Sequence, residues 1–244
     1  MRTSRIFVDA ALAEGRELSL PAAAANHLLR VLRLRAGAPL VLFNGLGGEH
    51  DATLLRAERT AALVTVGAHR AAERESPLRL TLMQGVSRGE RMDTIVQKAT
   101  ELGVSRIQPL LTEFGVVRLD AEAAARRRAH WRAVAIGACE QCGRCRVPEV
   151  ADVQEYAASL SAPSAGGGLR VLLAPEAEHS LAATARGDAL TLLIGPEGGL
   201  SGRERLLAER AGFVACRLGP RVLRTETAPL AALAVLQALL GDLR

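Results

Sequence analysis

The chain has 244 residues, of which 49% are hydrophobic and 2% aromatic, and its formal net charge is +5. The hydrophobic content suffices for packed cores and excludes a disordered or collagen-like chain, and the scarcity of aromatic residues argues against a base-stacking RNA-binding platform. The positive charge permits a polyanionic partner such as RNA, although the preference for arginine over lysine can also reflect genome composition.

The first part of the chain alternates short apolar runs with turns. Strands are predicted over residues 5–8, 17–20, 39–43, 49–55 and 61–66, with one helix over residues 22–31. Asn44-Gly45, followed by Gly47-Gly48, gives a strong turn signal between two of these strands. The pattern predicts a small β-barrel domain over residues 1–72 and a polar linker that ends at Pro77.

From residue 78 onward, strands and helices alternate. Strands are predicted over residues 78–84, 104–111, 169–174, 189–194 and 213–218, and helices over 90–102, 121–142, 203–211 and 229–240. This alternation is typical of a parallel sheet, so residues 73–244 are predicted to form an α/β domain. The longest apolar stretch, residues 228–240, is interrupted by Pro229 and Gln237 and is too short to span a bilayer. We therefore expect a soluble, cytoplasmic protein without membrane contact.

Two loops late in the chain carry most of the functional information. Residues 194–201 (IGPEGGLS) and 218–228 (LGPRVLRTETA) each follow an apolar strand and precede a helix. Open α/β sheets bind ligands at such turns, so the two loops predict one bipartite cofactor pocket. The first loop lacks the lysine of a P-loop and carries Glu197, whose charge disfavours a bare phosphate. Tight-turn formation by the glycines and helix capping by Thr227 are the structural alternatives.

Cys139, Cys142 and Cys145 form a C-x-x-C-x-x-C pattern, which also occurs in iron–sulfur and zinc sites. On a helix this spacing places the thiols on one face. The only other cysteine is Cys216, and no histidine stands at ligand spacing. We therefore expect buried thiols rather than a metal site. A metal protein is the alternative, which visible absorbance or stoichiometric zinc would reveal.

The long predicted helix carries a cluster of arginines and a polar end. Residues 138–144 (ACEQCGR) bring charged and amide groups to its end, after Arg126, Arg127, Arg128 and Arg132. A solvated basic surface is the ordinary explanation for such arginines. The functional alternative is that they hold an RNA backbone, which fixes register without reading sequence.

Four motifs in order resemble those of the RsmE-type ribosomal RNA methyltransferases. They are KATELGV (98–104), EQCGR (140–144), IGPEGG (194–199) and LGPRVLRTETA (218–228), with further similarity at HLLRVLR (27–33) and FNG (43–45). The resemblance covers essentially the whole chain. It implies an N-terminal PUA-like β-barrel, a C-terminal SPOUT α/β domain with a deep trefoil knot, and a homodimer.

The resemblance also implies an activity, which is S-adenosylmethionine-dependent N3-methylation of a uridine in 16S rRNA of the small ribosomal subunit, customarily numbered 1498. The knotted loops would hold the cofactor, and no metal is implied. The residues expected to bind the cofactor are Leu173, Pro175, Ile194, Gly195, Pro196, Glu197, Gly198, Gly199, Leu218, Gly219, Leu223, Thr225, Thr227 and Ala228.

Uridine N3 has to lose a proton before it attacks the methyl group. We hypothesise that Arg224 stabilises the negative charge that develops on the base, while Glu226 or Glu140 helps to accept the proton. The target base has to be unpaired or extruded, because N3 lies inside a Watson–Crick pair. The residues expected to contact RNA are Arg5, Arg30, Arg33, Arg88, Arg126, Arg127, Gln141 and Arg144.

Two other functions stay open on the sequence alone. One is a SPOUT enzyme that methylates another rRNA or tRNA nucleotide. The other is a non-enzymatic RNA-binding factor of ribosome assembly that has lost cofactor binding. The intact glycines and Thr225-Glu226-Thr227 argue against this second function. Calorimetry with S-adenosylmethionine would separate an enzyme from such a factor.

Overall fold

The structure is a computed structural model that describes residues 3–58, 61–160 and 168–243. The chain forms two compact units, one of Met1–Glu75 with Cys139–Val147 and one of Ser76–Ala138 with Pro148–Arg244. The first stretch of the first unit ends three residues after the predicted boundary between residues 72 and 73. The return of Cys139–Val147 to this unit was not predicted, because no local pattern signals it.

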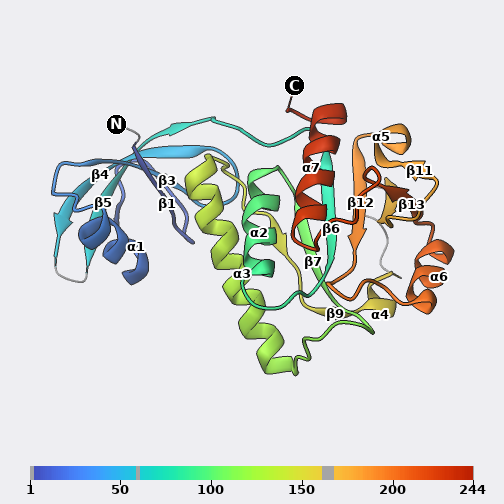
Figure 1. The fold of residues 1–244 in the computed structure, drawn as a ribbon. Helices are drawn as coiled ribbons and strands as arrows, with labels where there is room; N and C mark the ends of the chain where they lie inside the picture. Colours follow the sequence, from blue (N-terminus) through green and yellow to red (C-terminus); the bar gives the residue numbers. More distant parts are fainter. Residues whose placement is uncertain (1–2, 59–60, 161–167, 244) are drawn as a thin grey trace. The chain divides into compact units, whose positions relative to one another are not determined.

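The first unit is built on a five-stranded mixed sheet (Figure 1). Its strands are β1 (Ser4–Phe7), β2 (Glu17–Ser19), β3 (Pro39–Phe43), β4 (Glu49–Ala57) and β5 (Ala62–Arg70), in the spatial order β1-β3-β4-β5-β2. β1 pairs with β3 in parallel, and the other pairs are antiparallel. Helix α1 (Ala22–Asn26) and the π-helical turn η1 (His27–Val31) lie between β2 and β3 in the chain.

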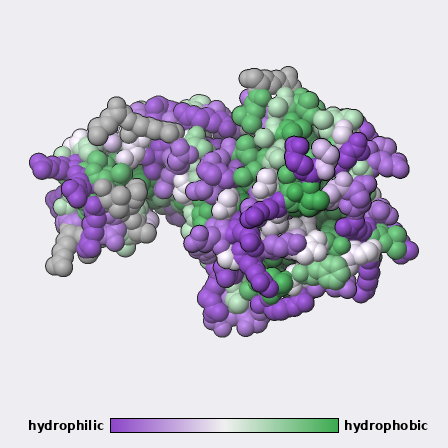
Figure 2. Space-filling model, in the orientation of Figure 1, coloured by the Kyte–Doolittle hydropathy of each residue, from purple (hydrophilic) through white to green (hydrophobic). Residues whose placement is uncertain are grey.

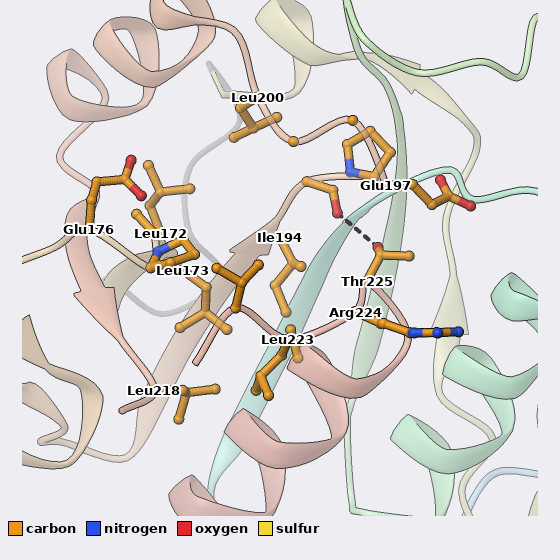
Figure 3. Close-up of a pocket in the computed structure, with 18 of the residues that line it drawn as sticks. Leu172, Leu173, Glu176, Ile194, Glu197, Leu200, Leu218, Leu223, Arg224 and Thr225 are labelled. Atoms are coloured by element: carbon orange, nitrogen blue, oxygen red, sulfur yellow. Dashed lines mark hydrogen bonds between the residues drawn. The ribbon is translucent and has the colours of Figure 1, made fainter. Parts of the chain in front are cut away.

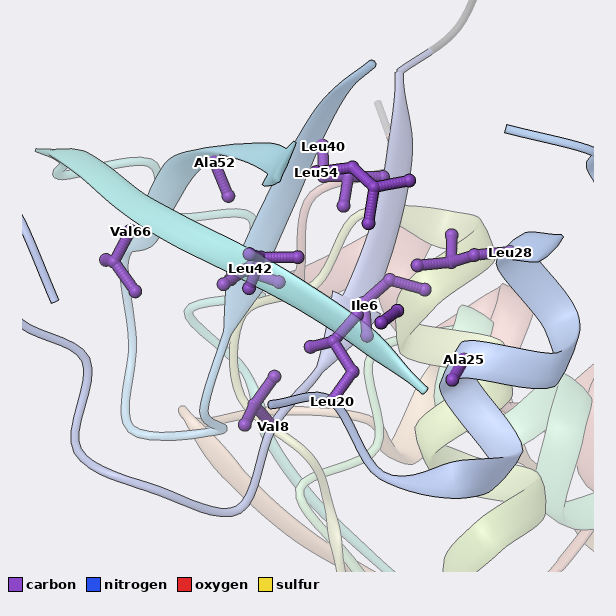
Figure 4. Packing of buried hydrophobic residues seen from close by; sticks show 12 residues of the cluster. Ile6, Val8, Leu20, Ala25, Leu28, Leu40, Leu42, Ala52, Leu54 and Val66 are labelled. Carbon is purple, nitrogen blue, oxygen red and sulfur yellow. The ribbon is translucent and has the colours of Figure 1, made fainter. Parts of the chain in front are cut away.

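Apolar residues that alternate along these strands give the first unit its own core. Figure 4 shows Ile6, Leu42, Leu54 and Val66 gathered from four strands, with Leu28 from the helical segment beside them. None of these five side chains belongs to a residue more than 2% exposed. Burial of one such side chain contributes about 1.5–3 kcal/mol relative to exposure, and all members of this cluster belong to the first unit.

The second unit is a parallel α/β sheet, as the alternation of strands and helices predicted. Its strands are β6 (Arg79–Gly85), β7 (Arg106–Leu111), β8 (Glu149–Val150), β9 (Gln154–Glu155), β10 (Leu169–Leu173), β11 (His179–Ser180), β12 (Ala189–Ile194) and β13 (Val214–Arg217). Their spatial order is β11-β13-β10-β12-β6-β7-β8, and β9 pairs with β7. Every residue of β12 is buried, which is typical of a parallel strand covered on both faces.

Helices lie between these strands in the chain, except the last helix, which follows the last strand. They are α2 (Arg91–Glu101), α3 (Ala121–Cys142), α4 (Tyr156–Leu160), α5 (Leu181–Thr184), α6 (Gly202–Arg210) and α7 (Thr227–Leu240). α2 packs beside α7, as Figure 1 shows, and α4 packs against α6. Two helix ends have clear causes in the sequence. Ser201 and Glu204 form a capping box at the start of α6, and α2 ends before Gly103, whose φ of +80° favours glycine.

The longer elements lie where the sequence predicts them, and β3, α3 and β12 have the predicted bounds. The elements that were missed are β8, β9, α4, β11 and α5, each of five residues or fewer. The trefoil knot stays a prediction. In the part of the chain that the structure describes, no helix combines the length and the apolar character needed to cross a membrane.

Candidate functional site

The carboxyl ends of β10, β12 and β13 border a cavity of about 1040 Å³ in the second unit (Figure 3). β10 pairs with both other strands, so the loops that follow the three strands meet at one edge of the sheet. The large apolar residues that line the cavity include Leu172, Leu173, Ile194, Leu200, Leu218 and Leu223. Its charged lining residues are Arg91, Glu176, Glu197, Arg205, Arg221, Arg224 and Glu226. An apolar cavity with a few polar groups is typical of a small-molecule site.

The loop after β12 follows a tight path that depends on glycine. Gly199 has a φ of +71°, and its backbone N–H donates to the Pro196 carbonyl over 2.9 Å. A Cβ on Gly195 would lie only 3.0 Å from the carbonyl carbon of Gly199. A Cβ on Gly85, the last residue of β6, would lie 2.5 Å from Pro196 Cδ. Gly85 therefore lets the loop pack directly on the end of β6, although it does not line the cavity and no motif indicated it.

Thr225 connects the two predicted loops. Its hydroxyl donates to the Gly195 carbonyl over 2.9 Å, and Ser87 Oγ lies 3.4 Å from the same hydroxyl. Gln84 Nε2 donates to Thr225 Oγ1 over 3.3 Å. Thr225 is 7% exposed and Gln84 is fully buried, so water competes little for these hydrogen bonds. Both loops line one cavity, as the sequence predicted, whereas Gln84 and Ser87 were missed because an isolated polar residue gives no signal.

The residues expected to bind a cofactor line the cavity, except for Gly219 and Thr227. Gly219 has a φ of +74° and forms the turn after β13, and Thr227 is the exposed first residue of α7. Each is adjacent in sequence to residues that line the cavity. Leu172 and Leu200 line the cavity without having been predicted. Their apolar character next to predicted positions was the available signal.

Two of the three predicted catalytic residues line the cavity, namely Arg224 and Glu226. Figure 3 shows the Arg224 side chain directed away from the leucine-lined wall. Glu140 belongs to the first unit, where its Oε1 accepts a hydrogen bond from the backbone N–H of Phe7 over 2.9 Å. This contact gives Glu140 a structural role, because the end of α3 packs with β1. Its contacts therefore lend no support to a role as proton acceptor.

Arg91, the first residue of α2, was not predicted and contacts both neighbouring carboxylates of the site. Its Nη1 lies 2.6 Å from Glu197 Oε1, and its Nε lies 3.7 Å from Glu226 Oε2. Desolvation alone would raise the pKa of the Glu197 carboxyl. Hydrogen bonds from backbone N–H groups, including that of Arg88, and from Arg91 outweigh it and lower that pKa. Glu197 is therefore ionised at neutral pH.

The predicted RNA-contacting residues fall into two groups. The exposed ones are Arg30, Arg33, Arg88, Arg126, Arg127 and Gln141. The other two are buried in the first unit, since the Arg5 side chain is 8% exposed and Arg144 is 4% exposed. Carboxylates far away in the sequence pair with both guanidinium groups. We therefore replace the interpretation of Arg5 and Arg144 as RNA contacts by a structural one.

Arg5, Glu49, Glu75 and Arg144 form what we call the buried ionic cluster. Glu49 is 3% exposed and pairs with Arg5. Arg5 Nη2 donates to the Arg144 carbonyl over 3.0 Å, and Arg144 Nε donates to Glu75 Oε2 over 2.9 Å. The cluster thereby connects the segment Cys139–Val147 to β1, to β4 and to Glu75, the last residue of the stretch Met1–Glu75. Buried charges of this kind are stable only when they are paired.

The cysteines of the C-x-x-C-x-x-C pattern lie in the same segment. Cys139 and Cys145 are buried, and Cys142 is partly buried. Burial raises the pKa of the Cys139 thiol to about 12, in spite of the nearby Arg144 charge. This thiol is therefore protonated and unreactive at neutral pH. Among the described residues, no group of three or more histidine, cysteine, aspartate or glutamate side chains is placed to hold a metal ion.

The sequence is similar to those of known RNA-modifying proteins. The family model of the RNA methyltransferase domain matches residues 74–237, and that of the RNA methyltransferase PUA domain matches residues 20–67. The ribosomal RNA small subunit methyltransferase E of Buchnera aphidicola subsp. Schizaphis graminum is 30% identical over 243 residues. This similarity covers 99% of the present chain and 98% of the Buchnera protein.

The fold is similar to those of solved structures with a bound cofactor. One is the crystal structure of a ribosomal RNA small subunit methyltransferase E from Neisseria gonorrhoeae bound to S-adenosyl methionine, with a TM-score of 0.91, 38% identity and coverage of 100% of both chains. Another is a structure from Legionella pneumophila in complex with bound SAM, with a TM-score of 0.94 and 39% identity. It covers 99% of the present chain and 100% of the Legionella chain.

Proposed function

Because the chain belongs to the RNA methyltransferase family, whose domain model matches residues 74–237, we propose that it methylates N3 of a uridine in 16S rRNA of the small ribosomal subunit. In this reaction S-adenosylmethionine donates the methyl group. The observation that carries it is the cavity at the ends of β10, β12 and β13, in a fold shared with chains that hold this cofactor. Since bacterial ribosomes are assembled in the cytoplasm, we place the protein there.

The cavity suits S-adenosylmethionine in size and chemistry. Its volume of about 1040 Å³ accommodates a nucleoside with an amino-acid tail. The leucine-rich wall suits the adenine ring, and the bare backbone at Gly195 and Gly199 admits close hydrogen bonds to the ligand. We further propose that the two loops form the trefoil knot expected of a SPOUT domain.

The residues of the second loop suit the reaction. The bound cofactor would supply a methyl group already activated by its sulfonium, so the protein mainly has to align the acceptor. Arg224 would stabilise the negative charge on the uridine ring as N3 loses its proton. Glu226, two residues further on and also lining the cavity, would accept that proton. Glu140 is not retained in this role, because its carboxylate is engaged with the backbone of Phe7.

Small ribosomal subunits from a strain that lacks this gene provide the direct test. We expect the purified protein to transfer label from S-adenosylmethionine to one nucleotide of 16S rRNA, which mass spectrometry identifies as 3-methyluridine. Labelling of a different nucleotide or of tRNA would contradict the assigned target. If calorimetry detected no binding of S-adenosylmethionine, the non-enzymatic assembly factor would become the better explanation.

We propose that the protein acts as a homodimer that forms through α7. This helix contains no charged residue over its 14 positions, and only one side of it is buried by its own unit, through residues such as Ala232, Leu233 and Leu236. Leu239 is 44% exposed, and Figure 2 shows hydrophobic residues gathered at the surface over α7. A second copy of the same apolar surface would cover it.

The introduction of a charge on α7 tests the dimer. We expect the wild-type protein to sediment at twice the 25.8 kDa of one chain, and Leu239→Asp to sediment as a monomer, because a carboxylate cannot be buried unpaired. Leu46→Asp is the control, since Leu46 is 75% exposed and lies in the first unit. A wild-type monomer, or a dimer that Leu239→Asp leaves intact, would contradict this interface.

A further inference from the structure

A single guanidinium joins two carboxylates that come from different loops of the cavity. Arg91 uses Nη1 for Glu197, at 2.6 Å, and Nε for Glu226, at 3.7 Å. Because different nitrogens make the two contacts, both can exist at once, and the planar fork of arginine fixes the angle between them more rigidly than a lysine ammonium would. All three residues line the cavity and belong to the second unit.

Glu197 is a fixed anchor for this arrangement. In addition to Arg91, the backbone N–H of Arg88 donates to Glu197 Oε1 over 3.0 Å. The Glu197 side chain is 28% exposed, compared with 43% for that of Arg91. A carboxylate that receives several charge-assisted hydrogen bonds holds its partners in a narrow geometry. Glu197 therefore fixes the orientation of the Arg91 guanidinium.

Glu226 faces Arg91 instead of capping its own helix. It is the N-cap residue of α7, yet its side chain makes no capping hydrogen bond. The Ser201 side chain at the equivalent position of α6, by contrast, accepts from the Glu204 N–H. The shorter side chains of Ser, Thr, Asp and Asn are the ones that ordinarily cap the first backbone N–H groups, so the longer Glu226 side chain is free to reach away from its own helix. The contact with Arg91 is thus the polar interaction that directs the Glu226 side chain, which is 24% exposed.

We propose that Arg91 is a positioning residue of the methyl transfer, which holds the Glu226 carboxylate at the cavity in the orientation that accepts the proton of the target base. This inference rests on the proposed function, because it requires a base that loses a proton. Arg91 itself touches neither the base nor the methyl group in this mechanism. It acts through Glu226, and Glu197 keeps its guanidinium in place.

A double-mutant cycle tests the proposal. The variants are Arg91→Gln, Glu226→Gln and the double variant, each assayed for kcat and for the KM of S-adenosylmethionine with 16S rRNA in small subunits. We expect Arg91→Gln to lower kcat about 10-fold and to change the KM of the cofactor little. The expected loss is smaller than the roughly 10²-fold or more that general-base catalysis contributes, because the Glu226 base itself remains. In the Glu226→Gln background, we expect the same change to have almost no further effect.

Lys98→Gln is the matched control, because Lys98 lies on the same helix and its side chain is 41% exposed. We expect it to leave kcat unchanged, and we expect all variants to keep the thermal unfolding midpoint of the wild type. If the kcat effects of Arg91→Gln and Glu226→Gln multiplied in the double variant, or if Arg91→Gln changed only the KM, the role of Arg91 would be overturned while the proposed function would stand. Absence of methylation by the wild-type protein would instead overturn the proposed function, together with this role.

Discussion

Glu49→Gln is expected to lower the free energy of unfolding by about 3–5 kcal/mol, which is the usual cost when a buried ion pair loses one partner. Glu49 is 3% exposed and pairs with Arg5, and Arg70 Nη2 lies 2.9 Å from its Oε1. Glutamine keeps the shape but not the charge, so the Arg5 guanidinium would remain buried without a counter-ion. Arg5 Nε already lacks a hydrogen-bond partner among the described residues, which leaves little scope for compensation.

Urea unfolding monitored by circular dichroism measures this loss, with Glu73→Gln as the matched control. Glu73 belongs to the same unit and pairs with Arg146 over 3.2 Å, but both side chains are about half exposed, at 43% and 55%. Exposed pairs contribute about 0–1 kcal/mol, so the control should unfold nearly as the wild type does. Equal losses for the two variants would show that the buried ionic cluster does not stabilise the fold.

Arg224→Ala is expected to reduce kcat by about 10²–10³-fold, the typical effect of removing one group that stabilises developing negative charge. Arg224 is exposed and lines the cavity, and its side chain is directed away from the leucine-lined wall (Figure 3). We therefore expect the affinity for S-adenosylmethionine to stay unchanged. Methyl transfer at saturating cofactor and saturating small subunits measures kcat, and calorimetry measures the affinity for the cofactor.

Arg210→Ala is the control for this second prediction. Arg210 is exposed at the end of α6 and does not line the cavity, so its removal takes away one positive charge without touching the site. Full methylation by Arg224→Ala would contradict the proposed role of Arg224. A loss of cofactor affinity without a change in kcat would assign Arg224 to cofactor binding instead.

Long continuous patterns in the sequence account for the elements whose bounds were predicted. β12 is apolar at nearly every position, and α3 extends over 22 residues, so both have the bounds that the pattern predicts. The missed elements are too short to show a period. β9, for example, has two residues and forms because β7 offers it a parallel partner. Such short strands depend on tertiary contacts that no local window contains.

The same distinction explains what could be predicted of the site. Glycine and proline mark the two loops because the backbone itself needs these residues, as it does at Gly199. Arg91 gave no signal, since a charged residue at a helix start is ordinarily solvated. Arg5 pairs with Glu49, 44 positions away, so its burial could not be read from its surroundings in the sequence. Motif membership likewise cannot separate Glu226, at the cavity, from Glu140 in the first unit.

The hydroxyl of Thr225 has a consequence for the thermodynamics of ligand binding. Its hydrogen bond to the Gly195 carbonyl, together with that from Gln84, ties the loop after β13 to the loop after β12. The two walls are thus preorganised before any ligand arrives, and less conformational entropy is lost when it binds. A Thr225→Val enzyme would bind its ligand with a more unfavourable entropy, even though valine retains much of the apolar contact.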